Sequence, residues 1–206
     1  MFTGIIEKTS RVENFRQQAA SAELVLSTGF ADIALGESIA IQGVCLTVAE
    51  ILNPREGRAL FHISPETIRC TNLGLLSRGQ VVNLERSVPN GGRFSGHWVQ
   101  GHVDGMGRIE DIAQEMGSDS NRCYRMTVSV PENLIRYCIA KGSITINGVS
   151  LTINRLLESN RIELQLIPHT WKNTHFSETV VGNQQNIEVD LIAKYVERLC
   201  QPYMKP

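Results

Sequence analysis

The sequence contains the same pattern twice. Residues 37–48 read ESIAIQGVCLTV and residues 142–153 read GSITINGVSLTI, and seven of the twelve aligned positions are identical. The match continues further along the chain, between residues 64–73 and residues 167–176. The period of about 100 residues is longer than a solenoid unit of about 20–50 residues and has the size of a small domain. The sequence therefore predicts a duplicated domain with two similar sites.

Most of the chain is predicted to be β-structure. Short runs of alternating or β-branched residues, bounded by Gly, Asn or Pro, are typical of strands. Such runs occupy residues 38–51, 58–64, 80–85, 125–130, 142–156, 161–167 and 184–192. Strands at this spacing indicate a small barrel or sandwich in each half. We assign residues 1–96 to the first domain, 97–189 to the second and 190–206 to a C-terminal segment, with a glycine-rich turn at residues 91–93 near the junction.

Short helices interrupt each half. Ser64 followed by Pro65 and an acidic residue is a helix start, and Pro168 marks its counterpart without a capping hydroxyl. A further short helix is expected after Pro131.

The C-terminal segment is predicted to form an amphipathic helix. Its apolar residues fall on one stripe and are Leu191, Ile192, Tyr195, Val196 and Leu199. The stripe either folds back on its own chain or pairs with other subunits. We favour pairing between subunits, because both repeats look complete without this helix.

Composition excludes several classes of function. The net charge is −1, so nothing indicates binding to nucleic acid or to an anionic membrane. The N-terminus has no basic segment followed by a long apolar one, and no run approaches the length of a membrane span. We therefore expect a soluble cytoplasmic protein whose five scattered cysteines are reduced thiols. Motifs for nucleoside triphosphates, dinucleotides and serine esterases are also missing from the sequence.

Each repeat carries a polar pair at positions i and i+2. Cys45 and Thr47 form the first pair, and Ser150 and Thr152 form the second. On a strand both members point to one face, opposite the leucine between them. Taken alone, such residues are ordinary surface positions, but their recurrence beside a glycine favours a functional role.

Two histidines lie close together in the sequence. His97 and His102 are five residues apart, so on a strand they would face opposite sides and would not share a metal. His102 is the stronger acid–base candidate, because Ile5 holds its place in the first repeat. Lys141, which corresponds to Gly36, either holds a polar ligand group or is a solvated loop residue.

The chain resembles the riboflavin synthase family. The resemblance rests on the segments MFTGIIE, GVCLTV, PETIRCTNLG, NLERS, GHWVQGHVDG, KGSITINGVSLT and LIPHT. It implies an all-β chain of two tandem six-stranded Greek-key barrels followed by a C-terminal helix that builds a homotrimer. It also implies that two molecules of 6,7-dimethyl-8-ribityllumazine react to give riboflavin and 5-amino-6-(D-ribitylamino)uracil, without cofactor or metal. Lumazine synthase is a further partner to consider.

The resemblance also implies which residues bind the two substrate molecules, at a site where the first barrel of one subunit meets the second barrel of its neighbour. The first-barrel pocket comprises Cys45, Leu46, Thr47, His62, Ile63, Ser64, Pro65, Glu66, Thr67, Gly101, His102 and Val103. The second-barrel pocket comprises Gly4, Ile5, Ile6, Ser150, Leu151, Thr152, Gln165, Leu166, Ile167, Pro168, His169 and Thr170. Lys141 would reach this site from the adjacent subunit.

Four of these residues are assigned catalytic roles. We expect His102, Ser150 and Thr152 to assist proton movement at one substrate molecule, and Cys45, or water held by it, to activate the other. Asn147 stands where some members of the family carry an acid, so no carboxylate role is assigned there. The alternative is a non-catalytic lumazine- or flavin-binding antenna protein of the same fold. A flavin reductase is a third class, but its flavin motif and nucleotide-binding domain are missing from the sequence.

Overall fold

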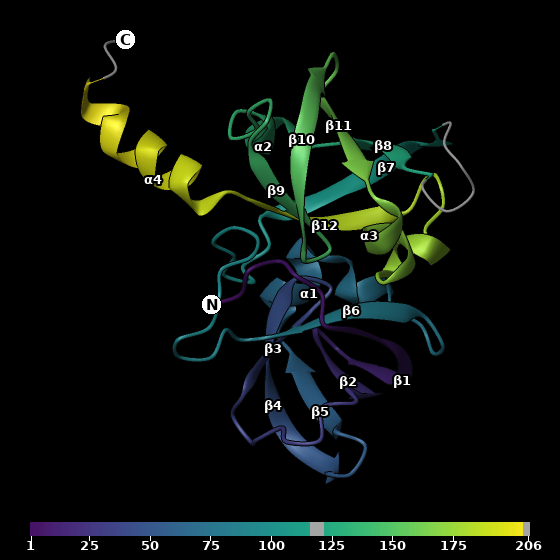
Figure 1. Cartoon of the computed structure of the whole chain (residues 1–206). Helices are drawn as coiled ribbons and strands as arrows, with labels where there is room; N and C mark the ends of the chain where they lie inside the picture. Colours follow the sequence, from purple (N-terminus) through teal and green to yellow (C-terminus); the bar gives the residue numbers. More distant parts are fainter. Residues whose placement is uncertain (116–121, 204–206) are drawn as a thin grey trace.

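The computed structural model describes residues 1–115 and 122–203, which form two closed β-barrels and a C-terminal helix (Figure 1). The first barrel has the strand order β1-β2-β5-β4-β3-β6. Its strands are β1 (Lys8–Gln18), β2 (Ser21–Ser27), β3 (Ser38–Ile41), β4 (Val44–Asn53), β5 (Arg58–Ile63) and β6 (Val81–Arg86).

The second barrel repeats this arrangement. Its strands are β7 (Gly105–Gln114), β8 (Tyr124–Ser129), β9 (Ser143–Ile146), β10 (Val149–Leu157), β11 (Arg161–Leu166) and β12 (Gln184–Val189). The order around the barrel, β10-β11-β8-β7-β12-β9, is the order of the first barrel with each strand replaced by its repeat counterpart. In each barrel three hairpin-connected strands are followed by a fourth that returns beside the first of them, which is a Greek key. The two-barrel fold predicted from the sequence is confirmed.

The helices are short except for α4. They are α1 (Pro65–Cys70), η1 (Asn72–Leu75), α2 (Glu132–Ile135), α3 (Pro168–Lys172), η2 (His175–Glu178), α4 (Leu191–Cys200) and η3 (Gln201–Tyr203). Ser64 caps α1 by accepting the N–H of Thr67 at 3.1 Å, whereas Ile167 precedes α3 without a side-chain cap, as predicted. Within the two described ranges, no helix is long and apolar enough to cross a bilayer.

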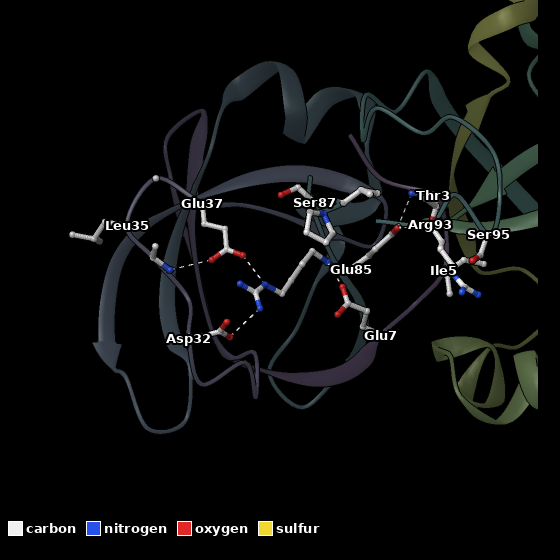
Figure 2. Close-up of a pocket in the computed structure, with 15 residues that line it drawn as sticks. Thr3, Ile5, Glu7, Asp32, Leu35, Glu37, Glu85, Ser87, Arg93 and Ser95 are labelled. Carbon is white, nitrogen blue, oxygen red and sulfur yellow. Dashed lines mark hydrogen bonds and ion pairs between the residues drawn. The ribbon is translucent and has the colours of Figure 1, made fainter. Parts of the chain in front are cut away.

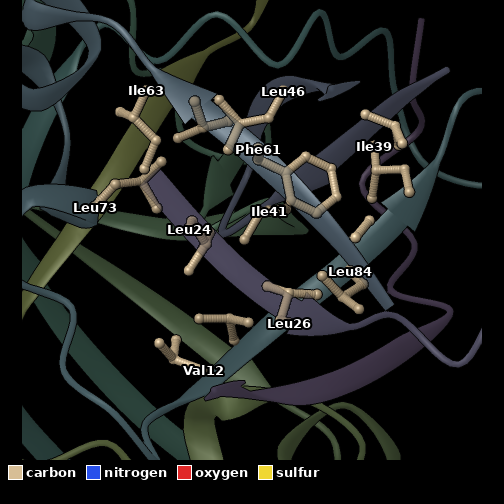
Figure 3. Packing of buried hydrophobic residues seen from close by; sticks show 14 of the residues in the cluster. Val12, Leu24, Leu26, Ile39, Ile41, Leu46, Phe61, Ile63, Leu73 and Leu84 are labelled. Atoms are coloured by element: carbon tan, nitrogen blue, oxygen red, sulfur yellow. The ribbon is translucent and has the colours of Figure 1, made fainter. Parts of the chain in front are cut away.

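Each barrel has its own apolar core. Side chains alternate along β4, so that Val44, Leu46 and Val48 are buried while Thr47 is exposed. Figure 3 shows Leu46 converging with residues such as Leu24 and Phe61 inside the first barrel. The second barrel has an equivalent cluster that includes Leu151, the repeat counterpart of Leu46.

The two barrels meet through their duplicated hairpin turns. Gln42-Gly43 joins β3 to β4, and Asn147-Gly148 joins β9 to β10; all four residues have positive φ, as a two-residue type I′ turn requires. A Cβ placed on Gly43 would lie 2.5 Å from the backbone nitrogen of Gly148, so the turns touch backbone to backbone.

Paired asparagines bridge the barrels beside these turns. The side-chain amide of Asn83 donates to the carbonyl of Asn147 at 3.0 Å, and that of Asn186 donates to the carbonyl of Gln42 at 2.8 Å. The two bonds occupy equivalent positions in the two repeats. The duplication therefore gives the interface an approximate two-fold symmetry.

Helix α4 stands away from the second barrel as an arm (Figure 1). Four apolar side chains of its predicted stripe are more than half exposed, and these are Ile192, Tyr195, Val196 and Leu199. At its base Asp190 caps the helix by accepting the N–H of Ile192 at 2.9 Å. The helix therefore offers an apolar face that the described part of its own chain leaves open.

Candidate functional site

The polar pairs lie on the outer face of their strands, as predicted. On β4 the Cys45 side chain is half-buried and Thr47 is exposed, and on β10 the same holds for Ser150 and Thr152. Leu46 and Leu151, which lie between the members of each pair, point into the barrel cores. The pairs therefore present a thiol with a hydroxyl, and two hydroxyls, on the outside of equivalent strands.

A segment at the N-terminus covers the second pair. Residues 1–7, here called the N-terminal strap, precede β1 and contain the predicted site residues Gly4, Ile5 and Ile6. The backbone N–H of Ser150 donates to the carbonyl of Gly4 at 2.7 Å. A Cβ on Gly4 would lie 2.6 Å from the Cβ of Ser150, so only glycine allows this approach. Ile6 packs against the core of the second barrel.

An equivalent segment covers the first pair. Residues 96–104, the junction strap, lie between the two barrels in sequence. The backbone N–H of Cys45 donates to the carbonyl of Gly101 at 2.9 Å, and a Cβ on Gly101 would lie 2.7 Å from the Cβ of Cys45. Val103 packs against the core of the first barrel. Each strap is thus exchanged: the segment that leads into one barrel contacts the first member of the other barrel's polar pair, Ser150 or Cys45, and leaves Thr152 and Thr47 exposed.

The two straps also pair with each other. Phe2 and Val99 exchange backbone hydrogen bonds of 2.8 and 3.2 Å, and both side chains are fully buried. They form a small apolar cluster with Ala40, against which Cys45 packs. The exchange places the predicted residues Gly4 and Ser150 together, and likewise Gly101 and Cys45.

His97 lies at the second pair. Its Nδ1 atom is 2.8 Å from the hydroxyl oxygen of Ser150, and burial lowers the pKa of the imidazole below its usual value, against an opposing effect of Asp190. The sequence favours His102 as the acid–base candidate because Ile5 holds its place in the first repeat, and the odd separation of the two histidines argues only against a shared metal. Neither pattern predicts that His97 lies at Ser150, because the junction strap is not a strand apart from the single bridge at Val99. His97 is therefore a residue at the pair that the sequence did not predict.

His102 is exposed on the junction strap, next to Gly101, which contacts Cys45. It therefore lies at the first pair, with Cys45, and not beside Ser150 and Thr152, with which it was expected to act. Its counterpart Ile5 is 45% exposed on the N-terminal strap. The equivalent positions of the two straps thus differ in chemistry, with the His102 imidazole at the first pair and the aliphatic Ile5 at the second, where His97 supplies an imidazole from a different position.

The remaining predicted residues lie at the starts of α1 and α3. His62 and Gln165 are exposed at the ends of β5 and β11, and Gln165 donates to the carboxylate of Glu115 at 2.7 Å. Ile63 and Leu166 point into the cores. Arg69 holds the pKa of the Glu66 carboxyl at about 2 by hydrogen bonding, so that group is anionic.

The other members of the predicted set at these helix starts are Ser64, Pro65, Thr67, Ile167, Pro168, His169 and Thr170. Lys141 is exposed in a turn with φ of 68° and donates its backbone N–H to Ile153 at 2.7 Å.

A cavity of about 830 Å³ lies beside the first barrel (Figure 2). It is lined by the N-terminal strap, the loop after β6 and charged side chains such as Glu37, which pairs with Arg86 at 2.7 Å. Of the residues predicted from the sequence, only Ile5 borders it. The cavity is therefore separate from both polar pairs, and we assign it no substrate.

Comparison with known proteins identifies the two repeats. The lumazine binding domain model matches this chain twice, at residues 3–87 and 100–190. The chain is 40% identical over 200 residues to riboflavin synthase of Bacillus subtilis (strain 168). The aligned region covers 96% of this chain and 89% of the relative. It is also 40% identical over 203 residues to riboflavin synthase of Mycobacterium tuberculosis (strain ATCC 25618 / H37Rv). Here the aligned region covers 97% of this chain and 98% of the relative.

Solved structures agree on the fold. The structure of LumP complexed with riboflavin superposes with a TM-score of 0.81 at 22% identity, covering 92% of this chain and 99% of that one. LumP complexed with 6,7-dimethyl-8-(1'-D-ribityl) lumazine gives a TM-score of 0.80 at 20% identity, with the same coverage. The duplicated barrels, the near-complete match to the synthases and the repeated domain model together lead to one conclusion: this chain belongs to the riboflavin synthase family and is an enzyme of that family with two lumazine-binding domains.

Proposed function

We propose that this enzyme joins two molecules of 6,7-dimethyl-8-ribityllumazine at two matched half-sites, one on each barrel. One molecule gives up a four-carbon unit and becomes 5-amino-6-(D-ribitylamino)uracil, and the other accepts it and becomes riboflavin. The atoms of two substrate molecules are divided between the two products with no net oxidation or reduction. The observation that carries the proposal is the pair of equivalent sites, each a polar pair on an outer strand face under a glycine strap.

The half-site on the second barrel is suited to moving a proton. The His97 imidazole is hydrogen-bonded to Ser150, and its lowered pKa keeps it neutral at pH 7, so it can accept a proton through the serine hydroxyl. The methyl group at C7 of the lumazine is the acid to be deprotonated. Thr152, on the same strand face, would bind the same molecule.

The half-site on the first barrel is suited to activating the other molecule. The Cys45 thiol, or water held by it, would add to C7 of that lumazine and be released when the new ring forms. His102 on the overlying strap would supply or remove the accompanying proton. Holding two ring systems in a fixed orientation would contribute much of the rate, because intramolecular positioning is worth up to about 7–11 kcal/mol.

We extend the binding role to the full set predicted from the sequence. Backbone groups of Leu46, Leu151, Ile63 and Leu166 take part in it, since their side chains lie in the cores. The helix starts at residues 62–67 and 165–170 would border the ribityl chain in the first and second half-site, and Lys141 would enter from the adjacent subunit.

The assembly is proposed to be a homotrimer held by α4. The open apolar face of α4 is what a subunit contact would bury, and packing of neighbouring chains would bring a first-barrel half-site opposite a second-barrel one. We propose domains at residues 1–96 and 97–189 with the trimer helix at 190–206. The free thiols suit the reducing cytoplasm, where lumazine synthase, as a source of the substrate, is a candidate partner.

Mixing the purified chain with 6,7-dimethyl-8-ribityllumazine tests this function. We expect yellow-green riboflavin fluorescence to appear, with one riboflavin and one 5-amino-6-(D-ribitylamino)uracil formed for two lumazine molecules consumed. Tight binding of lumazine without product would instead support the antenna alternative.

A further inference from the structure

Two buried carboxylates hold the two straps. On β6, Glu85 accepts the backbone N–H of Thr3 at 2.7 Å and that of Gly4 at 3.0 Å, and the contact with Thr3 is drawn in Figure 2. On β12, Glu188 accepts the N–H of Gln100 at 2.8 Å and that of Gly101 at 3.0 Å. The two glutamates are equivalent in the repeats and are 4% and 3% exposed.

These contacts replace the ladder that the straps lack. Outside the bridge between Phe2 and Val99, the described straps belong to no strand, so the N–H groups near the two glycines need partners of another kind. A carboxylate can accept two such donors at once, and charge-assisted bonds of this type are about twice as strong as neutral ones. Each glutamate therefore fixes the position of one strap's backbone, at the glycine that contacts the polar pair, relative to the strand that carries the glutamate.

The arrangement is crossed between the barrels. Glu85 belongs to the first barrel, but the strap that it holds gives the Gly4 carbonyl to Ser150 of the second barrel. Glu188 belongs to the second barrel, but its strap gives the Gly101 carbonyl to Cys45 of the first. In each case one residue, Gly4 or Gly101, donates to the carboxylate and accepts from the polar pair.

We infer that Glu85 and Glu188 are positioning residues that act crosswise: Glu85 sets the half-site on the second barrel, and Glu188 sets the half-site on the first barrel. Each barrel's last strand thus controls the geometry of the other barrel's site. The role assigned to the polar pairs rests on the proposed function, whereas the crossed mechanical coupling rests only on the hydrogen bonds.

The surroundings of the two carboxylates differ. Beside Glu188, Asp104 of the junction strap accepts the ammonium group of Lys194 on α4 at 2.6 Å and the N–H of Val189 at 3.0 Å. In the first barrel the equivalent position, Glu7, accepts the N–H of Arg86 at 2.7 Å. The junction strap is therefore also tied to the C-terminal helix, which makes Glu85 the simpler of the two carboxylates to test.

The substitutions Glu85→Gln and Glu188→Gln test the inference. Glutamine keeps the volume but can accept only through one oxygen, so its NH₂ group would face a strap N–H. Glu163→Gln is the matched control, because Glu163 is another buried carboxylate, on β11, paired with Arg125 and Arg155 at 3.7 and 3.6 Å and away from the straps. Circular dichroism would verify that each variant folds.

Backbone amide exchange, resolved by NMR, is the primary measurement. We expect Glu85→Gln to speed exchange of the Ser150 amide by about tenfold or more while leaving the Cys45 amide within about twofold of the parent. We expect Glu188→Gln to do the reverse and Glu163→Gln to change neither. Faster exchange confined to the carboxylate's own barrel, or equal at both amides, would overturn the inference, because a merely structural role predicts those patterns.

A second readout covers variants that fold poorly. The substitutions Glu85→Asp and Glu188→Asp keep the charge but shorten the reach, and alkylation of Cys45, located by peptide mass spectrometry, reports on the junction strap. Faster alkylation in Glu188→Asp than in Glu85→Asp supports the crossed arrangement, and equal rates refute it.

Turnover of 6,7-dimethyl-8-ribityllumazine separates the two proposals. Both glutamine variants should turn over at least about tenfold more slowly than the Glu163→Gln control. If the parent enzyme forms no riboflavin, the proposed function fails, while the exchange pattern still decides whether the carboxylates act crosswise.

Discussion

The imidazole of His97 lies 2.8 Å from the hydroxyl of Ser150, although the two residues are 53 positions apart and belong to the junction strap and the second barrel. The contact exists because the start of the junction strap lies beside the N-terminal strap, where the backbone N–H of His97 donates to the carbonyl of Thr3 at 3.2 Å. Burial lowers the pKa of His97, so the ring is a neutral base at the serine hydroxyl.

Replacing His97 by Gln should slow riboflavin formation by about 10²–10⁴-fold, the usual contribution of a general base. The parent rate should rise with pH through the lowered pKa of His97, because only the neutral ring accepts a proton, and this acidic limb should vanish in the variant. Steady-state kinetics between pH 5 and pH 8 would check both effects. Ser150→Ala should add little to His97→Gln if the two residues act as one unit; fully additive losses would show that they act separately.

Replacing Cys45 by Ser should slow turnover by about 10–100-fold without abolishing it, because positioning of two substrates provides most of the rate. Cys200→Ser, which alters an exposed thiol on α4, is the matched control and should behave like the parent. Rates measured under saturating lumazine would check the prediction. Complete loss of activity in Cys45→Ser would point to an obligatory covalent thiol intermediate.

Much of the fold was predictable because duplication and strand alternation are local signals. The outward direction of Cys45 and Thr47 follows from the alternation of side chains along β4, and the capping of α1 follows from Ser64. Strands β1, β2 and β7 are not among the segments that the sequence pattern predicts to be strands. In β1 only Val12 is buried, because this strand contributes little to the core and so carries a weak pattern.

The exchange of the straps was expected only from the family resemblance, since it depends on contacts between residues about 50–150 positions apart, which local patterns do not encode. The same cause explains why the sequence did not predict the contact between His97 and Ser150. Its side chain is directed by the path of the junction strap, which has no strand period. The side chains of Leu46 and Leu151 could be placed from the sequence, because the alternation of side chains along a strand is enough to direct them into the cores.

Replacing Gly43 by Ala should destabilise the chain by several kcal/mol, through backbone strain and through a clash with Gly148, whose nitrogen would lie 2.5 Å from the new Cβ. Gly79→Ala isolates the strain, because Gly79 also has positive φ but has open space around it, so it should cost only about 1–2 kcal/mol. Urea unfolding of both variants gives the comparison. Equal losses would mean that the two turns separate easily and that the barrels are loosely joined.

Replacing Val196 by Asp should dissociate the proposed homotrimer and reduce activity by more than about tenfold, because the charge would be buried in the proposed subunit contact of α4. Arg198→Gln, on the same helix but at a polar position, is the control. Sedimentation analysis and turnover would be measured on the same samples. A Val196→Asp variant that keeps the mass and activity of the parent would exclude α4 as the subunit contact.

Acid should weaken the interface between the barrels through His175. This ring is buried, and burial lowers its pKa from 6.5 to about 4. Its Nδ1 atom is 2.9 Å from the Asn83 side-chain amide nitrogen, and its Nε2 atom is 2.8 Å from the carbonyl oxygen of Gln185. The side-chain amide nitrogen of Asn147 also lies 2.8 Å from Nε2. A neutral ring can donate from Nε2 to Gln185 and accept from Asn83 at Nδ1, whereas protonation would place a second N–H against the amide donor of Asn83.

The sign of the pH effect follows from proton linkage. Between pH 6.5 and about pH 4 the unfolded chain binds the His175 proton and the folded chain does not, so folding stability falls as the pH falls, by on the order of 3 kcal/mol over this window. Burial raises the pKa of Glu85 and Glu188, which gives the opposite slope above pH 4.5, but these groups are common to the parent and to His175→Gln. Subtracting the urea-unfolding curves of the two proteins at pH 7, 5.5 and 4 therefore isolates the histidine. The variant should start less stable and converge on the parent as the pH drops, and a constant difference at all three pH values would show that His175 titrates alike in the folded and unfolded chains.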